Sequence, residues 1–120
     1  MRLNEITFTD AKPIDGYGPG FFRVGGERFE GAILCTGTGV KPWDGYEDEA
    51  QLLELAQDID VIFVGTGSEI AHIPAPLRAT LEQAGLGVEV MNSPSACRTY
   101  NILLSEGRRV AAALLPVDAV

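Results

Sequence analysis

The segment Gly65-Thr66-Gly67-Ser68 has the composition that best suits a ligand site. It directly follows the apolar run 61–64, and open α/β sheets bind ligands beyond the carboxyl ends of their strands. Free backbone N–H groups in a glycine-rich turn can hold an anion. The dinucleotide pattern GxGxxG fails, because Ile70 occupies the place of the third glycine, and Pro74 and Pro76 delay the next helix. The segment is therefore either a small anion or ligand site or a structural turn.

A second set of polar side chains, Ser95, Arg98 and Asn101, lies on a helix expected to begin at Ser93. Asparagine is a mediocre helix former, so its use inside a helix indicates a side-chain hydrogen bond with a role. These residues could line a groove together with the segment 65–68, or they could simply bond neighbouring parts of the chain.

Cys97 would lie in the first turn of the same helix, beside Arg98, and both features favour a thiolate. A nucleophile needs a base, and His72 is the only histidine, but nothing in the sequence places the two together. The favoured interpretation is a small, inert, buried side chain. A lone histidine also predicts no metal site, and no cofactor is expected. We identify no catalytic constellation, which leaves open whether the chain is an enzyme.

Trp43 and Tyr46 share one loop, which runs from Lys41 to Tyr46. Aromatic side chains on loops are common anchors in protein contacts. Trp43 could equally cap the core beneath the loop, and the sequence does not decide between these alternatives.

The composition describes one acidic domain spanning residues 1–120. A chain of 120 residues buries enough surface to fold without disulfide bonds or structural metal ions, and 46% of its residues are hydrophobic. The net charge of −8 opposes binding to nucleic acid or to anionic lipid. Arg108 and Arg109 form the only basic pair, at an expected strand start. The acidic surface serves solubility or offers a face to a basic partner protein.

The two cysteines, Cys35 and Cys97, are far apart in sequence and form neither a CxxC motif nor a zinc cluster. Residues 1–10 carry charges and lack the apolar region of a secretory signal. No run reaches the ~18 apolar residues of a membrane span. We therefore expect a cytoplasmic protein with reduced thiols and no direct membrane insertion.

The first third of the chain is rich in short β-prone segments and turns. The triplet Ile6-Thr7-Phe8 favours a strand, and residues 15–20 are turn material. Residues 21–36 predict a hairpin with a tight turn at Gly25-Gly26, a bulge at Gly31 and a buried run at 32–35. This third should supply a hairpin or a small second sheet.

The rest of the chain predicts alternating helices and buried strands. A helix is expected at 47–57, with acidic residues at its positive end. Strands are then expected at 61–64, 87–91 and 109–115, separated by helices at 75–84 and 93–105, the latter with Ser93 as N-cap and Pro94 at N1. This order of β-α-β-α-β predicts parallel strands joined by right-handed crossovers.

Several runs together resemble a known family. They are Asn92 to Leu103, Glu106 to Leu114, Tyr17 to Phe22, Lys41-Pro42-Trp43 and Val64 to Gly67. They resemble the domain-of-unknown-function family that includes the mitochondrial respiratory complex I assembly factor 3. The resemblance spans essentially the whole chain and implies a three-layer α/β fold with a mixed central sheet. The absence of a mitochondrial presequence makes this chain look like a bacterial member.

The resemblance also implies a groove proposed as an active site without an assigned reaction, and an assembly helper that acts through protein contacts. The leading hypothesis is therefore a protein-interaction or assembly-helper module. The alternative is a small-molecule or anion-binding groove, or an enzyme of unknown reaction. Self-association through an exposed edge strand, giving a homo-oligomer, stays open as well.

Overall fold

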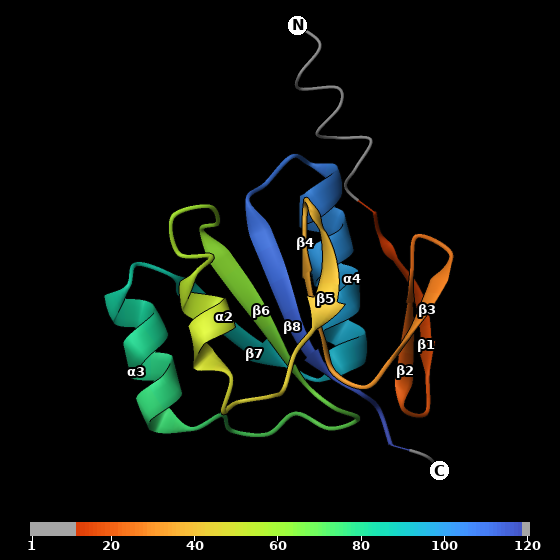
Figure 1. The fold of residues 1–120 in the computed structure, drawn as a ribbon, viewed down its shortest axis with the longest axis horizontal. Coiled ribbons are helices and arrows are strands. Elements are labelled where there is room, and N and C mark those ends of the chain that lie inside the picture. The colour runs from red at the N-terminus through yellow and green to blue at the C-terminus, as the bar shows by residue number, and fades with distance from the viewer. Residues whose placement is uncertain (1–11, 119–120) are drawn as a thin grey trace, which may run out of the picture.

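A five-stranded mixed sheet forms the centre of the fold (Figure 1). The computed structural model describes residues 12–118. The strand order is β5-β4-β8-β6-β7, in which β6, β7 and β8 are parallel and β4 runs antiparallel to both β5 and β8. The strands are β4 (Ile33–Thr36), β5 (Gly39–Pro42), β6 (Val61–Thr66), β7 (Gly87–Met91) and β8 (Val110–Leu115). The predicted mixed central sheet is confirmed.

A separate sheet of three antiparallel strands comes from the beginning of the described chain. Its strands are β1 (Ile14–Gly18), β2 (Phe21–Val24) and β3 (Glu27–Glu30). The β2–β3 hairpin turns at Gly25 and Gly26, whose φ values of 59° and 83° are those that a two-residue hairpin turn requires. The predicted small second sheet is therefore confirmed.

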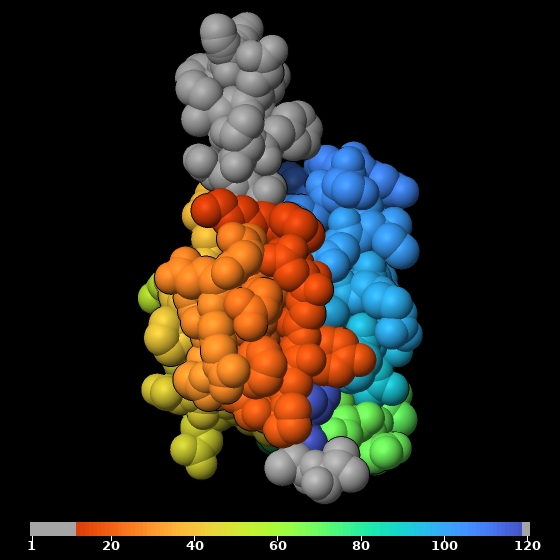
Figure 2. All heavy atoms as spheres, turned by 90° about the vertical axis from the view of Figure 1, so that its right-hand side faces the viewer, coloured from red at the N-terminus to blue at the C-terminus, as the bar shows by residue number. Residues whose placement is uncertain are grey.

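Three helices complete the α/β architecture of residues 12–118: α2 (Glu49–Leu53), α3 (Ala75–Gln83) and α4 (Ser93–Ser105). One face of the central sheet packs on α2 and α3, and the other packs on α4 and the small sheet. Side chains alternate along β8: Ala111 and Ala113 face the first core, while Ala112 and Leu114 face the second. Figure 2 shows the small sheet lying beside α4 on its side of the molecule.

The β-α-β-α-β order of the second half is confirmed. Val61 is the register partner of Gly87 in β7 and of Val110 in β8, and both pairings are parallel. The strands read as continuous apolar runs because helices cover both faces of the sheet. None of the helices within residues 12–118 has the length and apolar character needed to cross a bilayer.

The first third departs from its prediction in two places. Residues 15–20 were expected to be a turn, but β1 occupies most of them, and a register shift between Ile14 and Gly16 accommodates the extra residue as a bulge. The hairpin expected over 21–36 ends at Glu30. Gly31, with φ of 79°, redirects the chain into β4, because an apolar run that must bury both faces belongs inside the central sheet. The triplet 6–8 lies outside the described residues.

The middle segment differs as well. Lys41 and Pro42 were expected in a loop but belong to β5, an edge strand, where a proline at the end costs no ladder bond. The helix expected at 47–57 is regular only over α2. Beyond it the N–H groups of Leu55 and Ala56 bond the carbonyls three residues back, a tighter winding that leads the chain into β6.

Two further local predictions, the N-cap of α4 and the end of β6, are corrected. The N-cap is Asn92, whose side chain accepts from the Ser95 N–H at 2.8 Å, so Ser93 and Pro94 occupy the first helical positions. The strand expected at 61–64 continues to Thr66. Gly65 and Thr66 are therefore strand residues, and only Gly67 and Ser68 follow the strand.

Candidate functional site

Several polar groups of the segment 65–68 are hydrogen-bonded within the chain itself. The Gly67 N–H donates to Ser93 Oγ at 2.9 Å, and Ser93 Oγ donates to the Leu115 carbonyl at 2.6 Å. Thr66 Oγ1 donates to the Glu69 carbonyl at 2.7 Å, and Ser68 Oγ accepts from the Asp118 N–H at 2.8 Å. These bonds leave fewer free donors for an anion than the sequence alone indicated.

Gly65 allows the first turn of α4 to approach β6 closely. A Cβ on Gly65 would lie 2.7 Å from Ser93 Oγ and 2.9 Å from Ser93 Cα, far inside normal contact. Helix α4 therefore begins directly against β6, in a place where open α/β sheets commonly leave a crevice. The glycine serves close packing of a helix on a strand.

The three helix residues do not gather around one cavity. Arg98 Nη2 donates to Ser95 Oγ at 3.2 Å on the exposed side of α4. Asn101 faces the small sheet, where its Nδ2 donates to the Ile14 carbonyl at 2.9 Å and its Oδ1 accepts from the Ile14 N–H at 2.8 Å. Asn101 thus takes the place of a neighbouring strand as the hydrogen-bond partner of β1. Its position inside a helix had indicated a side-chain hydrogen bond of this kind.

Replacing Asn101 with alanine should lower the free energy of unfolding by about 1–2 kcal/mol, because both polar groups of Ile14 lose their partner. Urea unfolding would measure the change. Ile102→Ala, on the exposed side of the same helix turn, serves as the control. Equal stability of Asn101→Ala and the unsubstituted protein would mean that the two hydrogen bonds between Asn101 and Ile14 do not stabilise the fold.

Cys97 and Cys35 lie in the same core cluster as Tyr100. Burial raises the pKa of the Cys97 thiol to about 12, which outweighs the lowering by Arg98 that the sequence emphasised. Burial, and then the proximity of Cys97, raise the pKa of the Cys35 thiol to about 12. Both thiols are therefore protonated near neutral pH, which favours the inert interpretation of Cys97.

Alkaline pH should destabilise the fold through these thiols. Their ordinary pKa is 9.0 and their folded value is about 12, so above pH 9 the unfolded chain releases protons that the folded chain keeps. The free energy of unfolding should fall between pH 9 and 12, by up to about 1.4 kcal/mol per pH unit for each thiol. Urea titrations at several pH values should show a flatter decline in the Cys35→Ala/Cys97→Ala variant. An identical decline in both proteins would mean that the two thiols do not cause the loss of stability at alkaline pH.

The Tyr100 hydroxyl is fully buried and has no hydrogen-bond partner within residues 12–118. An unsatisfied buried hydroxyl costs about 1–3 kcal/mol. Tyr100→Phe should therefore raise the free energy of unfolding by about 1 kcal/mol, measured by urea denaturation. Tyr17→Phe, at a side chain that is 46% exposed, should change little. A loss of stability in Tyr100→Phe would mean that the hydroxyl has a partner, such as an internal water.

Trp43 is buried with 3% of its surface exposed, and its ring meets Tyr46 edge to face at 6.0 Å between centroids. Its Nε1 donates to the Asp48 carbonyl at 3.3 Å. The structure favours the alternative in which Trp43 caps the core beneath its loop. Tyr46 is partly buried and packs against the same core.

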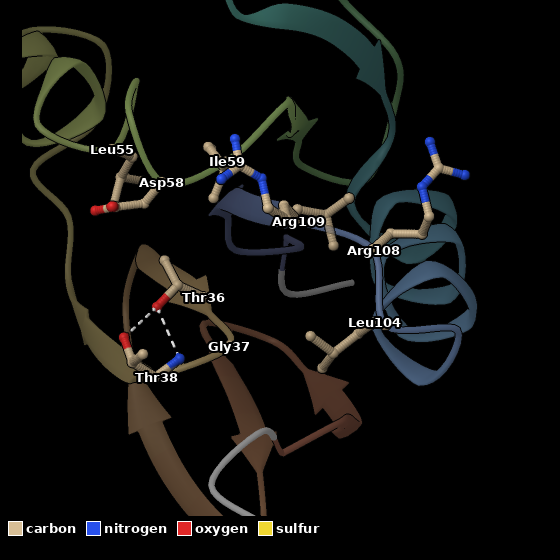
Figure 3. A pocket seen from close by; sticks show the side chains of 11 residues that line it. Thr36, Gly37, Thr38, Leu55, Asp58, Ile59, Leu104, Arg108 and Arg109 are labelled. Atoms are coloured by element: carbon tan, nitrogen blue, oxygen red, sulfur yellow. Dashed lines mark hydrogen bonds between the residues drawn. The ribbon is translucent and has the colours of Figure 1, made fainter. Parts of the chain in front are cut away.

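A cavity of about 440 Å³ opens at the opposite end of the sheet, where β6 and β8 begin and β4 ends (Figure 3). We call it the Leu104 cavity. It is lined by Thr36, Gly37, Thr38, Leu55, Asp58, Ile59, Leu104, Gly107, Arg108, Arg109 and Val110. None of the seven residues of the predicted groove is among them.

The wall of the Leu104 cavity is mainly aliphatic. Leu104 points toward the turn that joins β4 and β5, and Leu55 and Ile59 lie across the cavity from it (Figure 3). The hydroxyls of Thr36 and Thr38 lie 3.0 Å apart and hydrogen-bond one another. The site therefore suits an apolar group better than a strongly polar one.

Charged groups surround this cavity. Arg109 binds the Asp60 carboxylate, with 3.0 Å between Nη2 and Oδ1, and this contact lowers the pKa of the Asp60 carboxyl. Arg108 forms no ion pair with any residue in the range 12–118, and its guanidinium points away from the cavity (Figure 3). The sequence did single out this basic pair. It did not reveal that the turn 36–38, distant in sequence, forms the facing wall.

A smaller cavity of about 410 Å³ lies beside edge strand β7, lined in part by Ile70, His72 and Arg78. Ile70 is 64% exposed. Within residues 12–118 no three His, Cys, Asp or Glu side chains group in a way that could hold a metal ion.

Comparison with known proteins gives matches over nearly the whole chain. The family model described as "Protein of unknown function (DUF498/DUF598)" matches residues 14–115. An uncharacterized protein of Rhodobacter capsulatus is 49% identical over 117 residues, which are 98% of this chain and 94% of that protein. The human NADH dehydrogenase [ubiquinone] 1 alpha subcomplex assembly factor 3 is 34% identical over 123 residues, covering 97% of this chain and 67% of the human protein.

The fold also matches solved structures. The crystal structure of an outer membrane protein from Bartonella henselae superposes with a TM-score of 0.82 at 36% identity, covering 92% of this chain and 99% of that one. The residues matched by the family model, 14–115, include both sheets, α4 and every residue that lines the Leu104 cavity.

Proposed function

Because this chain belongs to the DUF498/DUF598 family, we propose that it is an assembly helper that binds a protein partner during construction of a multi-subunit complex. The observation that carries the proposal is the 34% identity to the human assembly factor across 97% of this chain. The relationship covers nearly the whole chain, but a shared fold does not by itself assign a function, so the experiment below tests the role directly.

The structure supports a binding role in two further ways. Several polar groups of the predicted groove at 65–68 are bonded within the chain, which reduces the support for an anion-binding or enzymatic groove there. The buried thiols are held protonated, which reduces the support for a cysteine nucleophile. A compartment that keeps Cys35 and Cys97 reduced, such as the cytoplasm, suits these unpaired thiols.

The complex named for the human relative is NADH dehydrogenase, and we propose the corresponding bacterial enzyme as the one assisted by this chain. The test uses a Rhodobacter capsulatus strain that lacks the relative with 49% identity. Native electrophoresis with staining for NADH oxidation should show less assembled enzyme, and expression of this chain should restore it. Succinate dehydrogenase in the same membranes is the control and should not change. An unchanged amount of assembled NADH dehydrogenase in the deletion strain would overturn the proposal.

A further inference from the structure

We propose that the Leu104 cavity receives an apolar side chain from a segment of a partner protein that carries Lys or Arg beside it. This inference rests on the proposed function and names the surface through which it would act. The partner is defined by its chemistry: one aliphatic or aromatic anchor flanked by cations.

The cavity has the size and wall of an anchor pocket. Its volume of about 440 Å³ falls within the range of about 300–1,000 Å³ that is typical of binding pockets. Leu55, Ile59 and Leu104 supply an aliphatic wall, and the two threonine hydroxyls nearest to it already bond one another. Removing an apolar side chain from water into such a pocket provides most of the energy in typical hot spots, while polar groups around it exclude water.

The charge of the adjoining segment selects the partner. Residues 54–60, which lead to the cavity wall, carry three carboxylates, Glu54, Asp58 and Asp60, and neither Lys nor Arg. Only Asp60 among them pairs with a cation of residues 12–118. The middle of this segment, from Leu55 to Ile59, is one wall of the cavity.

Arg109 also lines the cavity, but the Asp60 carboxylate neutralises it. Charge complementarity therefore favours a basic segment on the Asp58 side of the cavity. The whole chain, at −8, would attract such a partner over a longer range at low ionic strength. Arg108 stands on the opposite rim with its guanidinium turned outward, so it does not cover the cavity (Figure 3). The polarity of the rim also orients the partner, whose cations should lie toward Asp58 and away from Arg108.

Gly37 offers a way to fill the cavity without straining the backbone. Its φ lies outside the left-handed region, and a Cβ there would meet Leu104 Cδ1 at 3.9 Å, an ordinary contact. Gly37→Leu should therefore place its side chain where the partner's anchor would lie. Gly16→Leu is the matched control, because Gly16 also has an ordinary φ and a Cβ there meets nothing within 4 Å.

The binding test uses the full chain and synthetic peptides with lysine flanks and a central Leu, Phe, Trp or Ser. Peptides with an apolar centre should shift the amide NMR signals of Gly37, Thr38 and Leu104. Gly37→Leu should weaken this binding about tenfold or more, and Gly16→Leu should leave it unchanged. Equal binding of the Ser-centred peptide, or no shift of these three signals with any peptide, would overturn the inference.

A charge-reversal pair provides a second measure if Gly37→Leu does not fold. Asp58→Lys should weaken binding of the lysine-flanked peptides several-fold. Glu27→Lys, which makes the same change in net charge on β3 of the other sheet, should weaken it much less. Equal weakening by both variants, or equal binding of peptides with glutamate flanks, would overturn the basic character assigned to the partner.

The Rhodobacter capsulatus deletion strain separates this inference from the proposed function. If the unsubstituted chain and Gly16→Leu restore NADH dehydrogenase but Gly37→Leu does not, the cavity is the contact. If Gly37→Leu restores it fully, the cavity inference fails and the proposed function stands. If the unsubstituted chain restores nothing, the proposed function fails, and the peptide measurements alone decide the occupant of the cavity.

Discussion

Gly65→Ala is expected to lower the free energy of unfolding by roughly 3 kcal/mol, at the upper end of the usual cost of overpacking a core. The added Cβ would lie 2.7 Å from Ser93 Oγ, 2.8 Å from Leu114 Cδ2 and 2.9 Å from Ser93 Cα. A side chain could rotate away from the first two contacts, but the third atom belongs to the backbone of α4. Helix α4 must therefore move away from β6, which opens the core between them. Urea denaturation followed by far-UV circular dichroism would measure the loss.

Gly16→Ala is the matched control for this change. Gly16 is also a strand glycine with φ outside the left-handed region, and its Cβ would meet nothing within 4 Å. Alanine in a strand normally gains about 0.5–1 kcal/mol over glycine because it loses less backbone entropy. Gly16→Ala should therefore be neutral or slightly stabilising. If Gly65→Ala behaved in the same way, the close approach of α4 to β6 would be refuted.

Ser93→Ala is expected to cost about 2–4 kcal/mol. The Ser93 side chain is fully buried and joins three parts of the fold, because it accepts from the Gly67 N–H and donates to the Leu115 carbonyl. Alanine would leave both backbone groups without a partner, and each such buried group costs about 1–3 kcal/mol. Differential scanning calorimetry and urea titration should both report the loss.

Ser95→Ala, two residues further along α4, is the control. The Ser95 hydroxyl meets only Arg98 at the surface, so its removal should change stability by less than about 0.5 kcal/mol. The double variant Gly65→Ala/Ser93→Ala tests the coupling, since removing Ser93 Oγ relieves the shortest contact of the new Cβ. Its cost should be smaller than the sum of the two single costs. Simple additivity would show that the two residues do not contact one another.

The second half of the fold was predictable because each of its signals is local. Val61 to Val64 is apolar without interruption, which indicates a strand buried on both faces, and Pro76 and Gly85 bound the helix that follows. Once strand, helix and strand alternate at these lengths, chirality leaves one usual way to connect them. The observed parallel pairing of β6 with β7 and β8 follows from these local rules.

The sites were less predictable because they depend on pairs distant in sequence. Gly65 and Gly67 have the composition of a ligand turn, yet their neighbours in space, Ser93 and Leu114, lie more than twenty residues away. A glycine that admits a ligand and a glycine that admits a helix look identical in sequence.

The sequence by itself determined the secondary structure of the second half, the acidic surface and the family, because periodicity, charge and motif are properties of neighbouring residues. Only the tertiary structure decided that Ile33–Thr36 inserts beside β8, that Ser93 packs on Gly65 and bonds the Gly67 N–H, and that the turn 36–38 lies across a cavity from Leu104. Those contacts depend on which apolar faces cover one another. That choice is made by burial over the whole domain, which local propensity cannot encode.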